Sequence, residues 1–252
     1  MSGHSKWHNI RLRKAAIDSR KAKVFGKIAR EIIVAARSGG DADSNPRLRL
    51  ALQKARDARM PNDNIERAVK RGSGATDDVQ YEEAVYEGYG PGGAAIYLEV
   101  LTDNRNRTVA ELRRLLSKHG GAMGEAGCVA WVFDRKGIIH VPNSDGTNED
   151  LLMETAIEGG AEDIRVQDEN YEIVTSVEAF EEVKSRLQKH EIQWVSAEIS
   201  MIPNNQVPLS DDDARKILQL MEVLEDHDDI QQVSSNFDIP DEFFQEQEND
   251  GD

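Results

Sequence analysis

The chain has 252 residues, a formal net charge of -16 and one cysteine. This length allows one large domain or two to three small ones, and a single cysteine excludes an intramolecular disulfide framework. No apolar run approaches membrane-spanning length, and no apolar segment typical of a secretory signal follows the first basic residues, so we expect a cytoplasmic protein without membrane contact.

The charge is unevenly distributed along the chain. Residues 1–72 contain 18 Lys and Arg against 7 Asp and Glu, whereas the remaining residues contain 13 against 40. The whole-chain average would argue against nucleic acid as a partner, but the basic N-terminal part suits a polyanion. The acidic remainder would repel one. The sequence therefore predicts a nucleic-acid-binding part near the N-terminus.

The first thirty residues interleave cations with flat rings. The ring of Trp7 can stack on an unpaired base and Asn9 can read a base edge, while the cations contact phosphates. Packing of Trp7 in a helical core is the alternative. The predicted nucleic-acid-binding residues are Lys6, Trp7, His8, Asn9, Arg11, Arg13, Lys14, Arg20, Lys21, Lys23, Lys27 and Arg30.

Residues 20–37 have the period of an amphipathic helix. One side can pack on neighbouring helices and is formed by Ala22, Phe25, Ala29, Ile32, Ile33 and Ala36. The other side is a cationic row that we expect to face solvent, formed by Arg20, Lys23, Lys27, Arg30 and Arg37. Lys21 lies near the apolar edge.

Two further helices complete a small bundle. Asn45 and Pro46 are typical of an N-cap and a first helical position, and this helix continues to about Arg59. Pro61 begins the next helix, which ends at Gly72. The cations of these helices are either a solvated face or additional phosphate contacts, and they are Lys54, Arg56, Arg59, Arg67, Lys70 and Arg71.

After a short linker, two strand-like runs flank a glycine-rich turn at 90–93, and a helix follows at 108–119. The next loop contains Gly121-Ala-Met-Gly124, which matches the GxxG of KH domains that clamps a nucleic-acid backbone. Its place before a strand, instead of between helices, favours a plain loop. Residues 127–133 are predicted to form that strand, with Cys128 as a small buried side chain and not a nucleophile.

From residue 136 onward, strands and helices are expected in the order βαββαβ, which is typical of a ferredoxin-like split unit. Thr147 with Asp150 resembles a capping box for the first of these helices, and Ser176 is the expected cap of the second. Ser210 then caps a further helix, and residues 230–237 form a last strand.

These elements predict an α+β fold, with an N-terminal basic helical bundle and two α/β domains, the ferredoxin-like one inserted into the other. The basic helical domain is expected at residues 1–78. The discontinuous α/β domain is expected at 79–134 and 204–238, the inserted domain at 135–203, and an acidic disordered tail at 239–252.

No segment of the sequence points to catalysis. It contains no HExxH, Walker, dinucleotide-binding or Ser/His/Asp motif. His4 and His8 have a metal-ligand spacing, but no carboxylate or Cys lies near them, which favours stacking or hydrogen bonding. The acidic runs at 211–213 and 225–229 are interpreted as helix-start charge and an acidic turn, not as catalytic or calcium carboxylates. We expect no enzyme activity, no cofactor and no metal.

Several long motifs resemble the YebC/PmpR family, which includes the mitochondrial translational activator of cytochrome oxidase. They are MSGHSKWHNI at 1–10, KAKVFGKIAREI at 21–32, MPNDNIERA at 60–68, YEGYGPGG at 86–93, TDNRNRT at 102–108 and MIPN at 201–204. The resemblance implies a DNA-binding transcriptional regulatory protein and one α/β domain interrupted by another. It also implies an alternative, a ribosome-associated translation factor that binds ribosomal RNA and relieves stalled peptide-bond formation. A nuclease-type enzyme is a more distant alternative.

Overall fold

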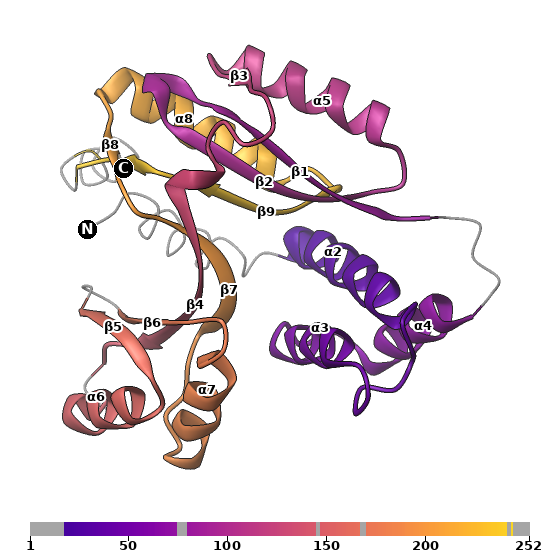
Figure 1. The fold of residues 1–252 in the computed structure, drawn as a ribbon, viewed down its shortest axis with the longest axis vertical. Helices are drawn as coiled ribbons and strands as arrows, with labels where there is room; N and C mark the ends of the chain where they lie inside the picture. The colour runs from indigo at the N-terminus through magenta and orange to yellow at the C-terminus, as the bar shows by residue number, and fades with distance from the viewer. Residues whose placement is uncertain (1–17, 75–79, 145–146, 167–169, 241–242, 244–252) are drawn as a thin grey trace. The chain divides into compact units, whose positions relative to one another are not determined.

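The computed structural model describes residues 18–74, 80–144, 147–166, 170–240 and 243 (Figure 1). In these residues an N-terminal helical part is followed by two antiparallel four-stranded sheets, which confirms the predicted α+β class. Residues 131–205 form one compact unit, and the described residues before and after them form a second. The finer domain boundaries stay predictions. No helix of the described part is long and apolar enough to cross a membrane.

The helical part is held by apolar faces and by one buried amide. Helix α2 (Asp18–Ala36) packs on α3 (Pro46–Asp57) and α4 (Asn62–Ser73). The side chain of Asn45 accepts the N–H of Leu48 at 3.1 Å and so caps α3, as predicted. Its amide also donates to the carbonyls of Ala35 and Gly39, both at 2.8 Å, which ties the end of α2 to the start of α3. The core also buries Ile28 and Ala35, which lie outside the predicted apolar side, whereas Ala22 is exposed.

The first sheet has the strand order β3-β1-β2-β9, and α5 and α8 cover one of its faces (Figure 1). Its strands are β1 (Glu82–Tyr89), β2 (Ala95–Thr102), β3 (Ala122–Met123) and β9 (Ile230–Ser235), and its helices are α5 (Arg105–Lys118) and α8 (Asp211–Glu225). The predicted turn between β1 and β2 is the short helix η1 (Pro91–Gly93), and Ser210 caps α8 as expected. The strands β8 (Val207–Pro208) and β10 (Phe237–Asp238) form a separate parallel pair.

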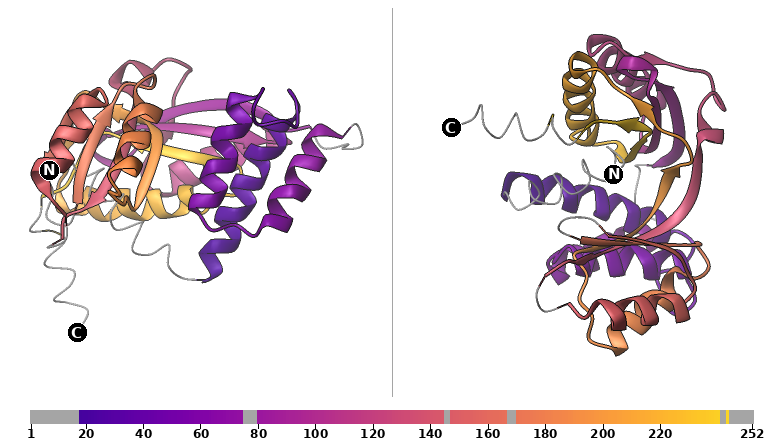
Figure 2. Two further views of the ribbon diagram at one scale, coloured as in Figure 1. Left: turned by 90° about the horizontal axis from the view of Figure 1, so that it is seen from below. Right: turned by 90° about the vertical axis from the view of Figure 1, so that its left-hand side faces the viewer.

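The unit of residues 131–205 follows the order β-α-β-β-α-β. Its elements are β4 (Phe133–Pro142), α6 (Glu149–Glu158), β5 (Ala161–Val166), β6 (Asn170–Thr175), α7 (Phe180–Lys189) and β7 (Ser196–Pro203). The antiparallel sheet has the order β5-β6-β4-β7, and both helices pack on the same face of it (Figure 2). The two ends of the unit lie together: Phe133 pairs with Pro203, and Asn204 donates to the carbonyls of Val132 at 2.9 Å and Trp131 at 3.2 Å.

Three local predictions are wrong. Residues 127–133 do not form a strand, because the short helix η2 (Ala130–Val132) precedes the start of β4. Asn148, not Thr147, caps α6, since the Thr147 hydroxyl donates to the carbonyl of Pro142 at 2.7 Å. The Ser176 hydroxyl accepts the N–H of Ala179 in a turn that precedes α7, so it does not cap the helix itself.

The contact between α2 and α4 depends on a glycine. A Cβ at Gly72 would lie 2.8 Å from the Cβ of Ala36 and would also meet the carbonyl of Ile33. We expect Gly72→Ala to lower the free energy of unfolding by about 1–3 kcal/mol through overpacking. Gly26→Ala is the matched control, because nothing lies within 4 Å of its added Cβ. It should raise stability by about 0.5–1 kcal/mol. Urea unfolding followed by circular dichroism checks both changes, and equal stability of the two variants would contradict the close contact.

Candidate nucleic-acid interface

Much of the predicted basic arm, the segment of residues 1–17 that precedes α2, lies outside the described residues. This applies to Lys6, Trp7, His8, Asn9, Arg11, Arg13 and Lys14, and to His4. The backbone of Arg20 belongs to α2, but its side chain is not described. The structure therefore locates four members of the predicted set by their side chains, namely Lys21, Lys23, Lys27 and Arg30.

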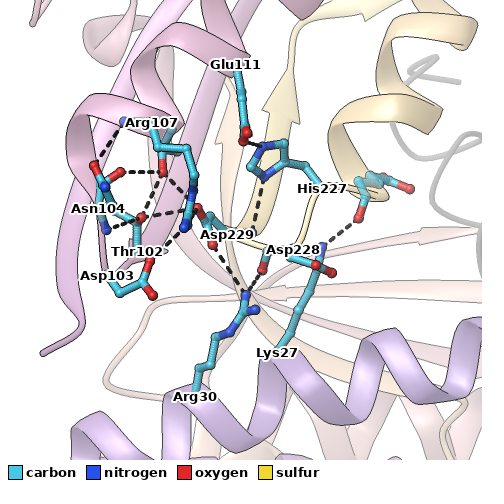
Figure 3. A network of polar contacts seen from close by, with 12 residues as sticks. Lys27, Arg30, Thr102, Asp103, Asn104, Arg107, Glu111, His227, Asp228 and Asp229 are labelled. Atoms are coloured by element: carbon cyan, nitrogen blue, oxygen red, sulfur yellow. Dashed lines mark hydrogen bonds and ion pairs between the residues drawn. The ribbon is translucent and has the colours of Figure 1, made fainter. Parts of the chain in front are cut away.

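The spacing of the cations predicts a row on α2 that faces solvent. In the structure, members of this row also contact other residues of the chain. The Nζ of Lys23 lies 3.0 Å from the carboxylate of Asp226, and the Nζ of Lys27 donates to the carbonyl of Glu225 at 2.6 Å. Arg30 donates to the carbonyl of Asp228, and its guanidinium lies 3.6 Å from the carboxylate of Asp229 (Figure 3). Three members of the row, Lys23, Lys27 and Arg30, therefore contact the acidic turn, residues 225–229, at the junction of α8 and β9. Arg37 instead donates to the carbonyl of Tyr81 at 3.0 Å.

The acidic turn suits these cations for two reasons. The last carbonyls of a helix carry partial negative charge, and α8 ends at Glu225. Three aspartates follow directly, at positions 226, 228 and 229. Lysine and arginine side chains of α2 thus meet both a helix C-terminus and carboxylates.

Asp229 is the buried centre of this region, with a side chain only 6 % exposed. Its carboxylate accepts hydrogen bonds from Arg107 at 2.7 Å, Thr108 at 2.7 Å and Thr102 at 3.1 Å. Burial alone raises the pKa of Asp229, but the hydrogen bonds from Arg107, Thr108 and Thr102 outweigh it, and the pKa is lowered. Asp229 is therefore a permanent anion at neutral pH.

His227 fixes the turn on its other side. Its Nδ1 accepts the backbone N–H of Asp229 at 3.2 Å, so its Nε2 carries the proton and donates to Glu111 at 2.9 Å (Figure 3). The acidic turn is thereby attached to α5 and β2 by contacts that do not involve α2.

A polar cavity of about 440 Å³ lies beside the network. It is lined by Lys23, Arg30, Tyr81, Asp103, Arg107, Glu111, Asp226, His227, Asp228 and Asp229. The cations and carboxylates of this lining pair with one another, as Arg107 does with Asp103 at 2.9 Å. An anion that bound these cations would have to replace the carboxylates.

The cations of α3 and α4 are more accessible. The exposed cations include Arg56 on α3, Arg59 in the turn between the helices, and Arg67, Lys70 and Arg71 on α4. Lys54 forms an ion pair with the carboxylate of Glu31 on α2, at 2.9 Å. In the described part of the chain, this face offers guanidinium and ammonium groups that a phosphate could approach directly.

The glycines of the 121–124 segment have packing roles. A Cβ at Gly121 would lie 2.6 Å from the carbonyl of Tyr89, and one at Gly124 would meet the Sγ of Cys128. The segment contains strand β3 and continues into a loop, not into a second helix. This arrangement supports the plain-loop interpretation over a backbone clamp.

The loop after Gly124 is organised by a buried carboxylate. Glu87 accepts the N–H groups of Gly127 at 2.6 Å, Val129 at 2.7 Å and Ala130 at 2.7 Å. These bonds replace the expected strand pairing. Cys128 is half-buried in this loop, and burial together with the charge of Glu87 raises its pKa, so its thiol is less easily ionised than an ordinary cysteine.

Sequence reasoning gave no role to the Asp229 network or to Glu87. The TDNRNRT motif did stand out, and it supplies Thr102, Arg107 and Thr108 to the network. Within the described residues, no group of three or more His, Cys, Asp or Glu is placed to hold a metal ion.

Comparison with known proteins identifies relatives along nearly the whole chain. Residues 5–75 match the TACO1/YebC protein N-terminal domain, and residues 81–237 match the TACO1/YebC second and third domain. A protein of Dictyoglomus turgidum is 53 % identical over 246 residues, covering 97 % of this chain and 99 % of the relative. One of Halothermothrix orenii is 54 % identical over 249 residues, covering 98 % of each. Both carry the name "Probable transcriptional regulatory protein".

The fold is also similar to a solved structure. The crystal structure of the conserved hypothetical protein Aq1575 from Aquifex aeolicus matches with a TM-score of 0.82 and 45 % sequence identity. The match covers 90 % of this chain and 94 % of that one.

The Asp229 network should make stability depend on pH. Because the folded pKa of Asp229 is lowered, its stabilisation is present above the unfolded pKa of about 4 and is lost as the pH falls through the folded value. We expect Asp229→Asn to cost about 3 kcal/mol at pH 7, and less as the pH falls from 4 to 3. Urea unfolding across this range measures the difference from the unmodified protein. The control Asp212→Asn, whose side chain is 85 % exposed, should change stability by less than about 0.5 kcal/mol. A cost for Asp229→Asn that does not vary with pH would contradict this assignment.

Replacing Glu87 should loosen the 124–130 loop. Gln in place of Glu87 has one acceptor oxygen and turns an NH₂ group toward N–H donors, leaving at least one buried N–H unpaired. We expect a loss of about 2–3 kcal/mol and faster amide hydrogen exchange at Val129 and Ala130. Glu125→Gln makes the same chemical change at an exposed position of the same loop and should leave exchange unchanged. Unchanged exchange in both variants would refute the role of Glu87.

Proposed function

The chain belongs to the TACO1/YebC family, and we propose that it is a non-enzymatic, DNA-binding transcriptional regulatory protein. In this proposal the basic N-terminal part holds the phosphate backbone. Two relatives that are 53–54 % identical over almost the whole chain are named as probable transcriptional regulators, which supports the proposal.

The observation that carries the DNA-binding step is the separation of charge. Residues 1–72 have a net charge of +11, whereas the remainder has -27. Exposed cations on α3 and α4 supply points of phosphate contact, and the arm before α2 supplies more cations. Such contacts give affinity and position the protein on the duplex, but they carry no base code.

The acidic remainder fits the same role. A net negative body is repelled by nucleic acid, so binding is directed through the helical part and non-specific coating is limited. We assign this body to two modules, the α/β module of 79–134 with 204–238 and a ferredoxin-like module of 135–203. The strand order β5-β6-β4-β7 with both helices on one face supports the ferredoxin-like assignment.

Removal of two exposed cations should weaken the salt dependence of DNA binding. Each lost phosphate contact lowers the slope of log K against log salt by about 0.9, so Arg67→Ala with Lys70→Ala should lower it by about 1.8. Fluorescence anisotropy with a labelled duplex measures the slope. Lys118→Ala with Lys189→Ala is the matched control, because it removes two exposed cations in the last turns of α5 and α7. Equal changes in both double variants would contradict an interface on the helical part.

In-cell crosslinking with sequencing of the attached nucleic acid tests the target class. We expect chromosomal DNA enriched at regulatory regions. Reads dominated by ribosomal RNA would overturn the DNA assignment in favour of a ribosome-associated factor, because both polyanions present the same phosphate charge to the helical part.

A further inference from the structure

We propose that the acidic turn, residues 225–229, is an intramolecular competitor of nucleic acid for the cationic row of α2. The inference rests on the proposed function, since it concerns regulation of the same basic surface. In the structure the turn contacts Lys23, Lys27 and Arg30 of this row, an arrangement that we call the closed state. A nucleic acid gains these three cations only by displacing the turn.

The cations that contact the acidic turn lie along one side of α2. Lys23, Lys27 and Arg30 are spaced by four and three residues, which places them on one face of a helix. Each reaches a different residue of the acidic turn, and together they meet the carboxylates of Asp226 and Asp229 and the carbonyls of Glu225 and Asp228. One face of one helix thus binds one short anionic segment, as it would bind a stretch of backbone phosphates.

The exposed end of the contact is the part that a polyanion can displace first, since at the other end the side chains of Arg30 and Asp229 are only 24 % and 6 % exposed. The side chains of Lys23 and Asp226 are 45 % and 48 % exposed, so water and salt screen their attraction. The apolar core of the helical part and that of the first sheet are separate clusters in the described residues, so the contact of α2 with the turn is polar. A polyanion that releases condensed counterions can compete with such a contact.

The acidic turn keeps its own structure when α2 leaves. Asp229 retains its bonds from Thr102, Arg107 and Thr108, and His227 retains Glu111. The turn is therefore held in place by the sheet and its helix α5. Separation of α2 from the turn does not require any part of the sheet to unfold. The apparent affinity of these cations for nucleic acid is their intrinsic affinity multiplied by the fraction of molecules in which the turn does not occupy them.

Zero-length carbodiimide crosslinking of the full chain tests the competition. The 3.0 Å separation of Lys23 Nζ and the Asp226 carboxylate should give a direct amide crosslink in the free protein, found by mass spectrometry of a protease digest. A saturating DNA duplex without terminal phosphates should reduce its yield at least about threefold, and anisotropy on the same samples measures binding. Bound duplex with an unchanged crosslink yield, or no crosslink in the free protein, would overturn the inference and leave the proposed function standing. Absence of duplex binding would refute the proposed function, and the inference with it.

A pair of variants separates competition from general charge. Asp226→Asn removes the most exposed anion that contacts the row and should raise duplex affinity about two- to fivefold, as expected for loss of an exposed ion pair. Asp212→Asn removes the same charge at the opposite end of α8, where it pairs with Arg215, and should leave affinity within about 1.5-fold. Equal gains in the two variants would assign the effect to net charge and sink the proposal.

Discussion

The buried carboxylate of Asp229 constrains the structure around the first sheet. A carboxylate removed from water loses several kcal/mol of hydration unless charged and hydroxyl donors replace it. Here the donors come from the end of β2 and the start of α5, and the acceptor comes from the turn between α8 and β9. These segments are more than 120 residues apart in the sequence. Satisfying one charge therefore fixes where α5 begins, where β9 begins and where the acidic turn lies.

The fixed position of that turn governs which cations of the helical part are accessible. Lys23, Lys27 and Arg30 on α2 meet the acidic turn of the same chain, whereas the cations on α3 and α4 are largely open to solvent. A highly charged chain thus partly neutralises itself by bringing its opposite charges together. The exposed pairs add little stability, since salt and water screen them, so their consequence is for access and not for folding.

Local chemistry in the sequence predicts much of the fold. Asn45 with Pro46, and Ser210 before α8, mark helix starts because capping involves residues only three positions apart. The βαββαβ order follows from periodicity in the same way. The strand expected at 127–133 is wrong because the amides of that segment bind Glu87, which lies 40 or more residues earlier and has no local signature. The candidate interface shows the same contrast between local and long-range signals. The cations of α2 are evident from spacing, but their partners are about 200 residues away, and no short-range pattern encodes that contact.

The unit of residues 131–205 leaves and rejoins the rest of the chain at one point. Pairing of Phe133 with Pro203, and the bonds from Asn204 to Val132 and Trp131, close a two-stranded stem at its base. Tension applied through the remainder of the polypeptide is carried across this stem by its hydrogen bonds, which are loaded one after another from the base because the strands are antiparallel. The helices α6 and α7 are bypassed. The unit is consequently a mechanical side branch, which can change length or composition without altering the path of the main chain around it.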